Sequence, residues 1–345
     1  MQNWQVIIVA ILKHVAGKSA DYGAALDYLK YEHDEVLKKP LLDANGNWVL
    51  RRDILLEGIN CEPELFDVEC EMLNAQYHKN QNYDEIKTHH YLISFDPADK
   101  DECGLTGEQA QAIGMEYVKA NFPGHQALVC THMDGHNGSG NIHVHIVINS
   151  LRKLDVPQQP FMERPIDCKA GYKHHLTKDY LKHLQQSLMN ICMRESLNQV
   201  DLLSPSVNKI TQQEYYAKQR GQINLDKLNA KLVSEGFTPM KTKFQTEKNK
   251  LRNAITAAAK KAKSFEEFSR LLQTESNILV QDHRGRFSYL LPDKEKYISA
   301  RTLGTSFDRE HLLTLFESNA ITAAKEKQQW SVADPIAVLY IKSNL

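Results

Sequence analysis

Three histidines in one stretch of the sequence have the types and spacing of a metal site. His143 and His145 alternate with aliphatic residues in IHVHIVIN, residues 142–149. Because side chains alternate across a strand, both histidines share one face and the aliphatic side chains occupy the other. His132 lies near the end of the preceding strand-like segment, QALVCTHMD, and a hairpin between the two segments brings it opposite the pair. Three neutral imidazoles on one sheet face predict a metal ion whose remaining coordination positions are open to a substrate.

Two hypotheses are open for these histidines on the residues alone. They either hold a metal ion or hydrogen-bond to neighbouring groups inside an ordinary hairpin. A lone histidine favours the second hypothesis, whereas a His-x-His pair with a third histidine opposite favours the metal. Imidazole ligands suit Zn, Fe, Ni or Cu better than Mg. Asp134, two residues after His132, either orients a histidine through a hydrogen bond or is a turn residue.

The segments around the histidines predict the elements that must position them. Strands are expected where apolar residues alternate or run together, and helices where they recur every three to four residues. Ser19 is expected to cap the first helix, and Thr106 with Gln109 forms a capping box before another. The stretch after the first helix, up to about residue 86, is expected to be polar and irregular. The predicted strands are residues 4–14, 89–95, 126–134 and 142–150, and the predicted helices are residues 17–35, 106–122 and 176–197.

The chain changes character after the last of these helices. Residues 205–263 hold thirteen Lys or Arg against four Asp or Glu, which indicates a polyanion partner or, on charge alone, a solvated helical face. The rest is expected to be mainly helical, with a β-hairpin at residues 277–291. We therefore predict an α+β domain of residues 1–205, an antiparallel sheet with helices packed on one face, followed by a basic, mainly helical region of residues 206–345.

Composition narrows the class of protein. The chain has 345 residues, of which 42% are hydrophobic and 25% charged, as in an ordinary globular protein. It contains no apolar run long enough for a membrane span, and its first residues indicate a strand and not a signal peptide. The six cysteines are scattered without a CxxC pair, which predicts reduced thiols in a cytosolic protein.

The histidine stretch resembles a motif of a known family. THMDGHNGSGNIHVHIVIN is similar to the third motif of relaxases, the mobilisation nucleases of conjugative plasmids and transposons. Relaxases belong to the histidine–hydrophobic–histidine (HUH) endonuclease class, so the resemblance implies the HUH nuclease fold. The family pattern is His-x-Asp, a loop and then His-x-His-x-x-x-Asn. It falls here on His132, Asp134, His143, His145 and Asn149.

Two further stretches carry the same resemblance, which covers residues 1 to about 200. HHYLISF, residues 89–95, resembles the second motif, a strand that ends in Ser-Phe, and this puts Ser94 near bound DNA. AALDYLKY, residues 24–31, resembles the first motif, which carries a nucleophilic tyrosine. The three motifs occur in the order that the family has.

Helix geometry tests which tyrosine the first motif supplies. At about 100° per residue, Tyr22, Leu26 and Leu29 form one narrow stripe that is expected to pack on the core. Tyr28 and Tyr31 point away from that stripe, and both can face the active site. The resemblance selects Tyr28 as the nucleophile, with Tyr31 as the alternative.

The resemblance implies an activity, cofactors and partners. A relaxase nicks one strand at an origin of transfer, and its tyrosine becomes linked to the DNA 5′ end. The implied cofactor is a divalent metal, Mn or Mg, with Zn still open. The implied partners are single-stranded and hairpin DNA, accessory relaxosome proteins and a coupling protein, in the bacterial cytoplasm and without membrane insertion. Residues 206–345 are then expected to bind DNA.

Three other functions compete with this one. A replication initiator of the HUH class uses the same chemistry, but such enzymes often carry a Tyr-x-x-x-Tyr pair, whereas Tyr28 and Tyr31 are three residues apart. A metal-dependent phosphoesterase would turn over without a covalent protein–DNA adduct. A non-catalytic module with the same fold would bind DNA without cleaving it.

Overall fold

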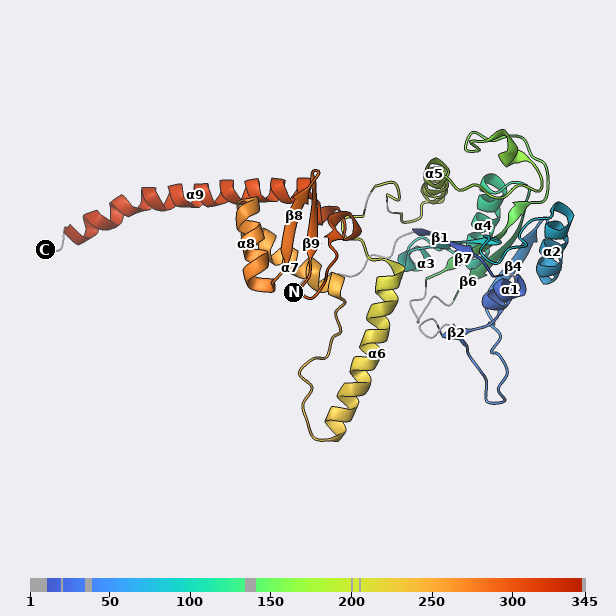
Figure 1. The fold of residues 1–345 in the computed structure, drawn as a ribbon, viewed down its shortest axis with the longest axis horizontal. Coiled ribbons are helices and arrows are strands. Elements are labelled where there is room, and N and C mark those ends of the chain that lie inside the picture. Colours follow the sequence, from blue (N-terminus) through green and yellow to red (C-terminus); the bar gives the residue numbers. More distant parts are fainter. Residues whose placement is uncertain are drawn as a thin grey trace. The chain divides into compact units, whose positions relative to one another are not determined.

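The computed structural model describes the chain in two compact units, Met1–Ser204 and Pro205–Leu345 (Figure 1). Each unit is considered by itself. The described residues are 11–19, 21–34, 39–133, 141–199, 201–204 and 206–342, without the side chains of 212 and 326–342.

The first unit is built on a five-stranded sheet in which every neighbouring pair is antiparallel. The strand order is β1-β5-β7-β6-β4, so β7, the strand with the His-x-His pair, lies at the centre. This confirms the predicted antiparallel α+β architecture. The strands are β1 (Ile11–Gly17), β4 (Ile54–Ile59), β5 (Thr88–Ser94), β6 (His125–His132) and β7 (His143–Arg152).

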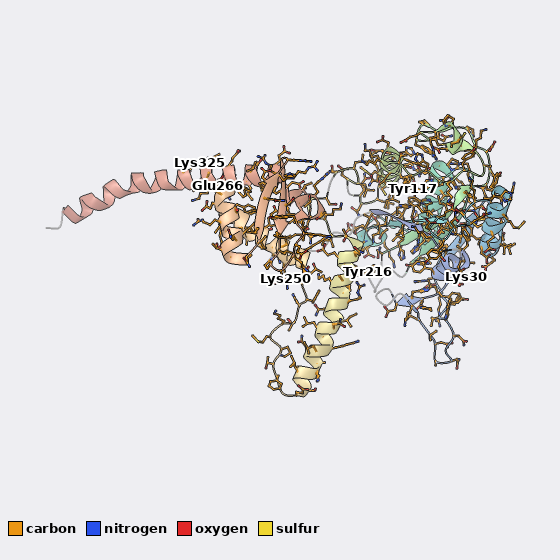
Figure 2. The ribbon with its side chains drawn as sticks, viewed as in Figure 1. Lys30, Tyr117, Tyr216, Lys250, Glu266 and Lys325 are labelled. Atoms are coloured by element: carbon orange, nitrogen blue, oxygen red, sulfur yellow. The ribbon has the colours of Figure 1, made fainter. Side chains whose placement is uncertain are left out.

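Two long helices, α4 (Gly107–Asn121) and α5 (Lys178–Arg194), cover one face of this sheet. The core between them and the sheet includes the aliphatic side chains of β7, as the strand alternation predicts. Tyr117 of α4 lies in this core (Figure 2), where its hydroxyl donates to the Leu184 carbonyl of α5 at 2.9 Å. The predicted capping box of Thr106 and Gln109 is present at the start of α4.

The other face of the sheet also carries helices, whereas the sequence predicted helices on one face only. α1 (Gly23–Lys30) and α2 (Phe66–Tyr77) pack on Leu128 and Cys130 of β6 and on Val147 of β7. These apolar residues continue the histidine face of their strands away from the histidines. The helices therefore cover one part of that face and leave the histidines at their edge.

The expectation of an irregular stretch up to residue 86 was wrong. That stretch contains both β4 and α2. Phe66, Cys70 and Leu73 recur at helical spacing and are buried, and this narrow apolar stripe is easily lost among polar neighbours. β4 pairs only with β6 at the edge of the sheet, and its short sequence ILLEGI lacks the two-residue alternation of a half-buried strand.

The N-terminal elements also differ in their limits from the prediction. β1 begins the described chain at Ile11, and residues 4–10 of the predicted strand lie outside the described residues. Ser19 does not cap α1, because its hydroxyl accepts from the Asp21 backbone at 3.1 Å. The Asp21 carboxylate instead accepts from the Ala24 amide at 3.0 Å, inside the first turn. The shorter elements of this unit are β2 (His33–Asp34), β3 (Lys39–Pro40), η1 (Pro63–Leu65), α3 (Pro97–Asp101) and η3 (Pro165–Cys168).

The second unit is mainly helical with a small hairpin, as predicted. A separate core joins α7, α8, the hairpin and the start of α9. Arg252 and Glu214 form an ion pair inside this unit at 2.5 Å, with side chains 3% and 7% exposed. The elements are α6 (Gln212–Ser234), α7 (Glu247–Lys261), α8 (Phe265–Ser276), β8 (Leu279–His283), β9 (Arg286–Leu290), β10 (Ile298–Ser299), η4 (Ala300–Thr302), η5 (Thr305–Phe307) and α9 (Arg309–Lys342).

Two further expectations concern the cysteines and membrane-spanning helices. The six cysteines are all free thiols. Among the described residues, no helix combines the length and the apolar character that crossing a bilayer requires.

Candidate metal centre and nucleophile

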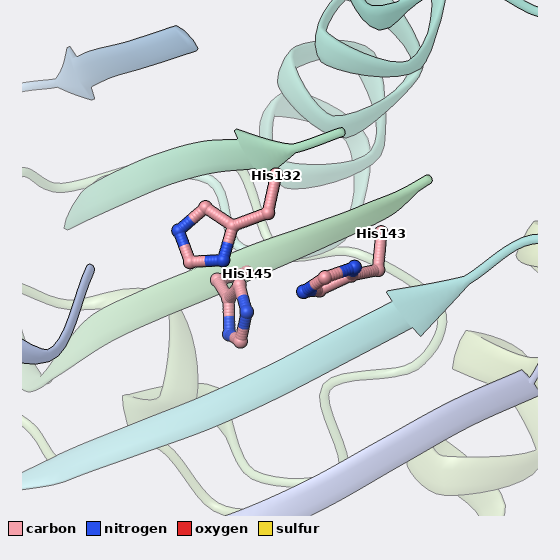
Figure 3. Close-up of side chains that lie close together, drawn as sticks. All are labelled: His132, His143 and His145. Atoms are coloured by element: carbon pink, nitrogen blue, oxygen red, sulfur yellow. The ribbon is translucent and has the colours of Figure 1, made fainter. Parts of the chain in front are cut away.

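The structure brings the three predicted metal ligands together. His132 on β6 pairs directly with His143 on β7, and Cys130 pairs with His145, so the three rings gather at one end of two adjacent strands (Figure 3). One ligand nitrogen from each ring lies within 4.8 Å of the other two. The side chains are 0%, 2% and 1% exposed in sequence order. Imidazoles bind metals in their neutral state.

Backbone carbonyls determine the tautomers of two of these rings. His132 Nε2 lies 2.9 Å from the Leu29 carbonyl, and His143 Nδ1 lies 3.3 Å from the Asn141 carbonyl. Because a carbonyl only accepts, each of these nitrogens carries the proton and donates it. The other nitrogen of each neutral ring, Nδ1 of His132 and Nε2 of His143, then carries the lone pair that a metal ion binds.

This donor set fits a divalent metal ion. Three neutral imidazole nitrogens from two paired strands leave room for further ligands, as catalytic metal sites do and closed structural sites do not. The histidine face of the sheet can therefore hold a metal ion, and an oxygen atom of a substrate can occupy one of the ion's open coordination positions. The identity of the ion is a separate question, because imidazoles accept several metals.

Tyr28 lies beside this cluster. It occupies the last turn of α1, one residue before Leu29, whose carbonyl holds His132. Its half-buried ring meets that of His145 edge-on, with the ring centres 5.7 Å apart. The carbonyls of a helix's last turn need hydrogen-bond donors from outside the helix. The hydrogen bond from His132 therefore satisfies the end of α1 and attaches the tyrosine-bearing helix to the histidines.

The other tyrosines of this segment have different surroundings. Tyr31 follows the last residue of α1, and its ring lies edge-on to Trp48, 5.4 Å between centres. Tyr22 is 2% exposed and accepts from the Asn74 side chain at 2.8 Å, and burial raises its pKa to about 12. The prediction that Tyr22 packs in the core is confirmed.

The remaining predicted residues are found on or beyond the same face. Ser94 is buried at the end of β5, directly opposite His143, and its hydroxyl accepts from the Asn141 side chain at 2.7 Å. Asn149 is buried four residues beyond His145, and its side chain donates to Gln126 at 3.1 Å and accepts from the Leu151 amide at 3.1 Å. These hydrogen bonds connect Asn149 to β6 and to its own strand, and neither of them involves a histidine ring. Asp134 lies outside the described residues.

Comparisons with known proteins address the family. Residues 48–157 match the family model described as relaxase, MobA/VirD2-like, nuclease domain. These residues are therefore similar to the nuclease domain of relaxases. The matched segment contains Ser94 and the three histidines but begins after Tyr28, so the identity of the nucleophile stays a prediction.

Individual relatives of this chain are distant. Two proteins called Protein rlx from Staphylococcus aureus are 24% and 21% identical to it over 263 and 252 residues. Those matches cover 76% and 73% of this chain and 68% and 63% of the relatives, so the chain spans about two thirds of their length. A solved conjugative relaxase TrwC, metal-bound and in complex with oriT DNA, aligns over 91% of this chain and 99% of its own. Its identity is 13% and its TM-score 0.30, which is too low to carry an argument.

One residue beside the histidine cluster was missed by the sequence analysis. His90 of β5 faces the histidine cluster, and its Nε2 lies 2.8 Å from Nδ1 of His145. Its ring is also edge-on to Tyr28 at 6.0 Å. The signal was present in HHYLISF, because strand alternation puts residue 90 on the same face as Ser94, which the second motif had already placed near the site.

A second group of histidines lies away from this site and was also missed. His89, His125 and His174 are all buried, and the ring of His174 lies 4.6 Å from His89 and 5.7 Å from His125. Burial lowers the pKa of His89 and of His125 to about 3, and it lowers that of His174 as well. These histidines are therefore neutral at physiological pH and contribute to packing in the first unit.

Proposed function

We propose that this chain is a relaxase that nicks one DNA strand at an origin of transfer, with Tyr28 as the nucleophile and His132, His143 and His145 as the ligands of a divalent metal ion. The observation that carries the proposal is the contact between Tyr28 and the histidine cluster. The tyrosine ring lies against His145, and the carbonyl next to it in the chain accepts from His132. A nucleophile and the group that binds its target phosphate must be held together in this way.

The chemistry is a transesterification at phosphorus. The phenolic oxygen of Tyr28 forms a bond to phosphorus as the bond to the 3′ oxygen breaks, so the phosphate stays on the 5′ end and a 3′-hydroxyl leaves. When bound, a divalent ion supplies positive charge to the nonbridging phosphate oxygens. Tyr28 loses a proton and the 3′ oxygen gains one, so the reaction conserves the number of phosphoester bonds and is reversible. The strand can therefore be rejoined without ATP.

Tyr31 is the weaker candidate for the nucleophile. Its ring contacts Trp48 and it lies past the end of α1, whereas Tyr28 contacts two histidines of the site. The Tyr31 carbonyl also accepts from the Arg51 side chain at 3.1 Å, which fixes the backbone there in an extended conformation. We therefore assign the attack to Tyr28.

We further propose the cofactor, the partners and the location. Mn and Mg are the expected ions, with Zn open because imidazole ligands favour it. Single-stranded and hairpin DNA at the origin would bind the first unit, and the surplus of Lys and Arg over residues 205–263 would contact the phosphate backbone. Accessory relaxosome proteins and a coupling protein complete the set of partners, and the bacterial cytoplasm is where such DNA is found. Ser94 would lie near the DNA and Asp134 would support the ligands, whereas the Asn149 side chain is bonded to Gln126 and Leu151 and would not.

A denaturing gel tests the nucleophile. Single-stranded oligonucleotides that tile the noncoding DNA beside the reading frame, labelled at their 3′ ends, are incubated with the chain and Mn²⁺. We expect one oligonucleotide to transfer its label to the protein. The Tyr28→Phe variant should lose this adduct and the matched Tyr31→Phe variant should keep it. An adduct that persists in Tyr28→Phe and disappears in Tyr31→Phe would refute the assignment.

The same assay separates the competing functions. A phosphoesterase would release cleaved DNA over many turnovers and never form an adduct. A non-catalytic module would shift the oligonucleotide on a native gel and leave it intact. A replication initiator would form the adduct but would support plasmid replication, and not mobilisation, when the noncoding DNA is cloned beside a marker.

The metal ligands are tested independently of DNA. His143→Ala removes one of three ligands, so its metal content after dialysis against Mn²⁺ or Zn²⁺ should fall well below that of the wild type. Elemental analysis measures this directly. An unchanged metal content would refute the ligand assignment even if the adduct forms.

A further inference from the structure

The inference concerns His90 and rests on the metal site of the proposed function. We propose that His90 is a positioning residue that holds His145 in the tautomer that binds metal. The two rings belong to adjacent strands, and His90 Nε2 lies 2.8 Å from His145 Nδ1. At that distance one nitrogen donates and the other accepts.

The direction of this hydrogen bond decides whether His145 is a ligand. In a neutral imidazole only one nitrogen carries a proton. If His145 Nδ1 donates to His90, the lone pair of His145 is on Nε2, away from His90. If His90 donates instead, His145 Nε2 carries the proton and does not bind a cation. Metal binding therefore requires that His90 accept, which places the His90 proton on its Nδ1.

The other two ligands show the same arrangement with different acceptors. His132 donates to the Leu29 carbonyl, and His143 donates to the Asn141 carbonyl. Each ligand histidine thus has one nitrogen assigned to an acceptor, and only for His145 is that acceptor a side chain. A side-chain substitution removes the acceptor of His145 and leaves the two carbonyls in place.

Outer acceptors of this kind affect metal affinity by known amounts. Their removal from a ligand histidine typically costs about 10- to 100-fold in affinity, because the ring loses its orientation and its tautomer. A contact that only filled space beside Tyr28 would not have this effect. The proposal therefore predicts a difference between substitutions that keep an acceptor and those that keep only volume.

Two variants at residue 90 make this comparison. His90→Gln retains an acceptor oxygen, and His90→Leu retains similar bulk without one. Isothermal titration of the DNA-free chain with Mn²⁺ and with Zn²⁺ should give a dissociation constant about 10- to 100-fold weaker for His90→Leu and within a few-fold of wild type for His90→Gln. Equal affinities for wild type and His90→Leu would overturn the proposal, as would a His90→Gln variant as weak as His90→Leu.

His89→Leu is the matched control. His89 precedes His90 in the same strand, points to the opposite face and also makes an imidazole–imidazole hydrogen bond, to His14 at 2.9 Å. Its replacement disturbs a buried ring without touching the metal site, so metal affinity should stay at the wild-type level. If His89→Leu weakens binding as much as His90→Leu, the effect comes from strand disruption and the proposal is refuted.

A spectroscopic measurement on the wild-type chain needs no variant. Nitrogen-15 shifts of the histidines in the Zn²⁺-loaded chain should show a protonated Nδ1 and a metal-bound Nε2 for His145, and a deprotonated Nε2 for His90. A protonated His90 Nε2 in the loaded chain would overturn the proposal. These results do not depend on DNA cleavage. A wild-type chain that binds neither metal would overturn both the metal site and the role of His90, whereas loss of the DNA adduct alone would leave the role of His90 standing.

Discussion

The buried histidines of the first unit make its stability depend on pH, and His125 gives the clearest case. Its side chain is fully buried and its pKa is lowered to about 3 by burial, from an ordinary value of 6.5. Below pH 6.5 the unfolded chain binds a proton at this residue and the folded chain does not. Stability therefore falls as the pH drops from 6.5 toward 3.

The size of the loss follows from linkage. At pH 5 the unfolded state gains about 2 kcal/mol from protonating this one residue, because the pH lies 1.5 units below 6.5. The figure barely depends on the folded pKa as long as that pKa stays well below 5. His89, with a pKa lowered to about 3, adds a loss of the same sign.

Tryptophan fluorescence can isolate the first unit. The chain has three tryptophans, of which Trp4 and Trp48 lie in the first unit and Trp330 in the second. In a Trp330→Phe background with EDTA, urea unfolding followed by fluorescence reports on the first unit. Adding His125→Gln should reduce the loss of unfolding free energy between pH 7.5 and pH 5 by about 2 kcal/mol. Burial keeps His89 and His174 neutral in both folded chains, so their contributions cancel. An unchanged pH dependence would refute the argument that His125 is neutral when folded.

Three further predictions concern packing, a buried charge and the metal. Gly114→Ala puts a methyl group 2.6 Å from the nearest Val144 side-chain carbon, between α4 and the sheet, and should lower the unfolding free energy of the first unit by about 1–3 kcal/mol in the same urea assay. Glu214→Gln leaves the buried Arg252 without its anion and should lower the unfolding free energy of the second unit by about 3–5 kcal/mol. Hydrogen exchange in α7 should become faster, and wild-type exchange rates there would contradict the prediction. Mn²⁺ should raise the melting temperature of the wild type and EDTA should reverse this, whereas His143→Ala should respond to neither.

The sequence predicted the centre of the fold better than its edges. The alternation in IHVHIVIN identified both the apolar face of β7 and the face that carries His143 and His145, because a two-residue period is unambiguous on a central strand. α2 was missed because it buries only three residues, which gives a weak period, and β4 was missed because its residues are only partly buried and do not alternate. Because α2 was missed, the sequence analysis also failed to predict that helices cover the second face of the sheet.

The orientation of the ligands is the part of the site that no sequence pattern contains. A His-x-His pair with a third histidine opposite identifies which rings converge, but a ring binds metal through only one of its two nitrogens. Here the Leu29 and Asn141 carbonyls decide that choice for His132 and His143, and backbone carbonyls are present at every position of every sequence. Only the fold determines which carbonyl meets which ring. For His132 the carbonyl comes from the last turn of α1, and the same turn places Tyr28 against His145. The placement of the proposed nucleophile and the tautomer of a proposed metal ligand therefore depend on one helix end.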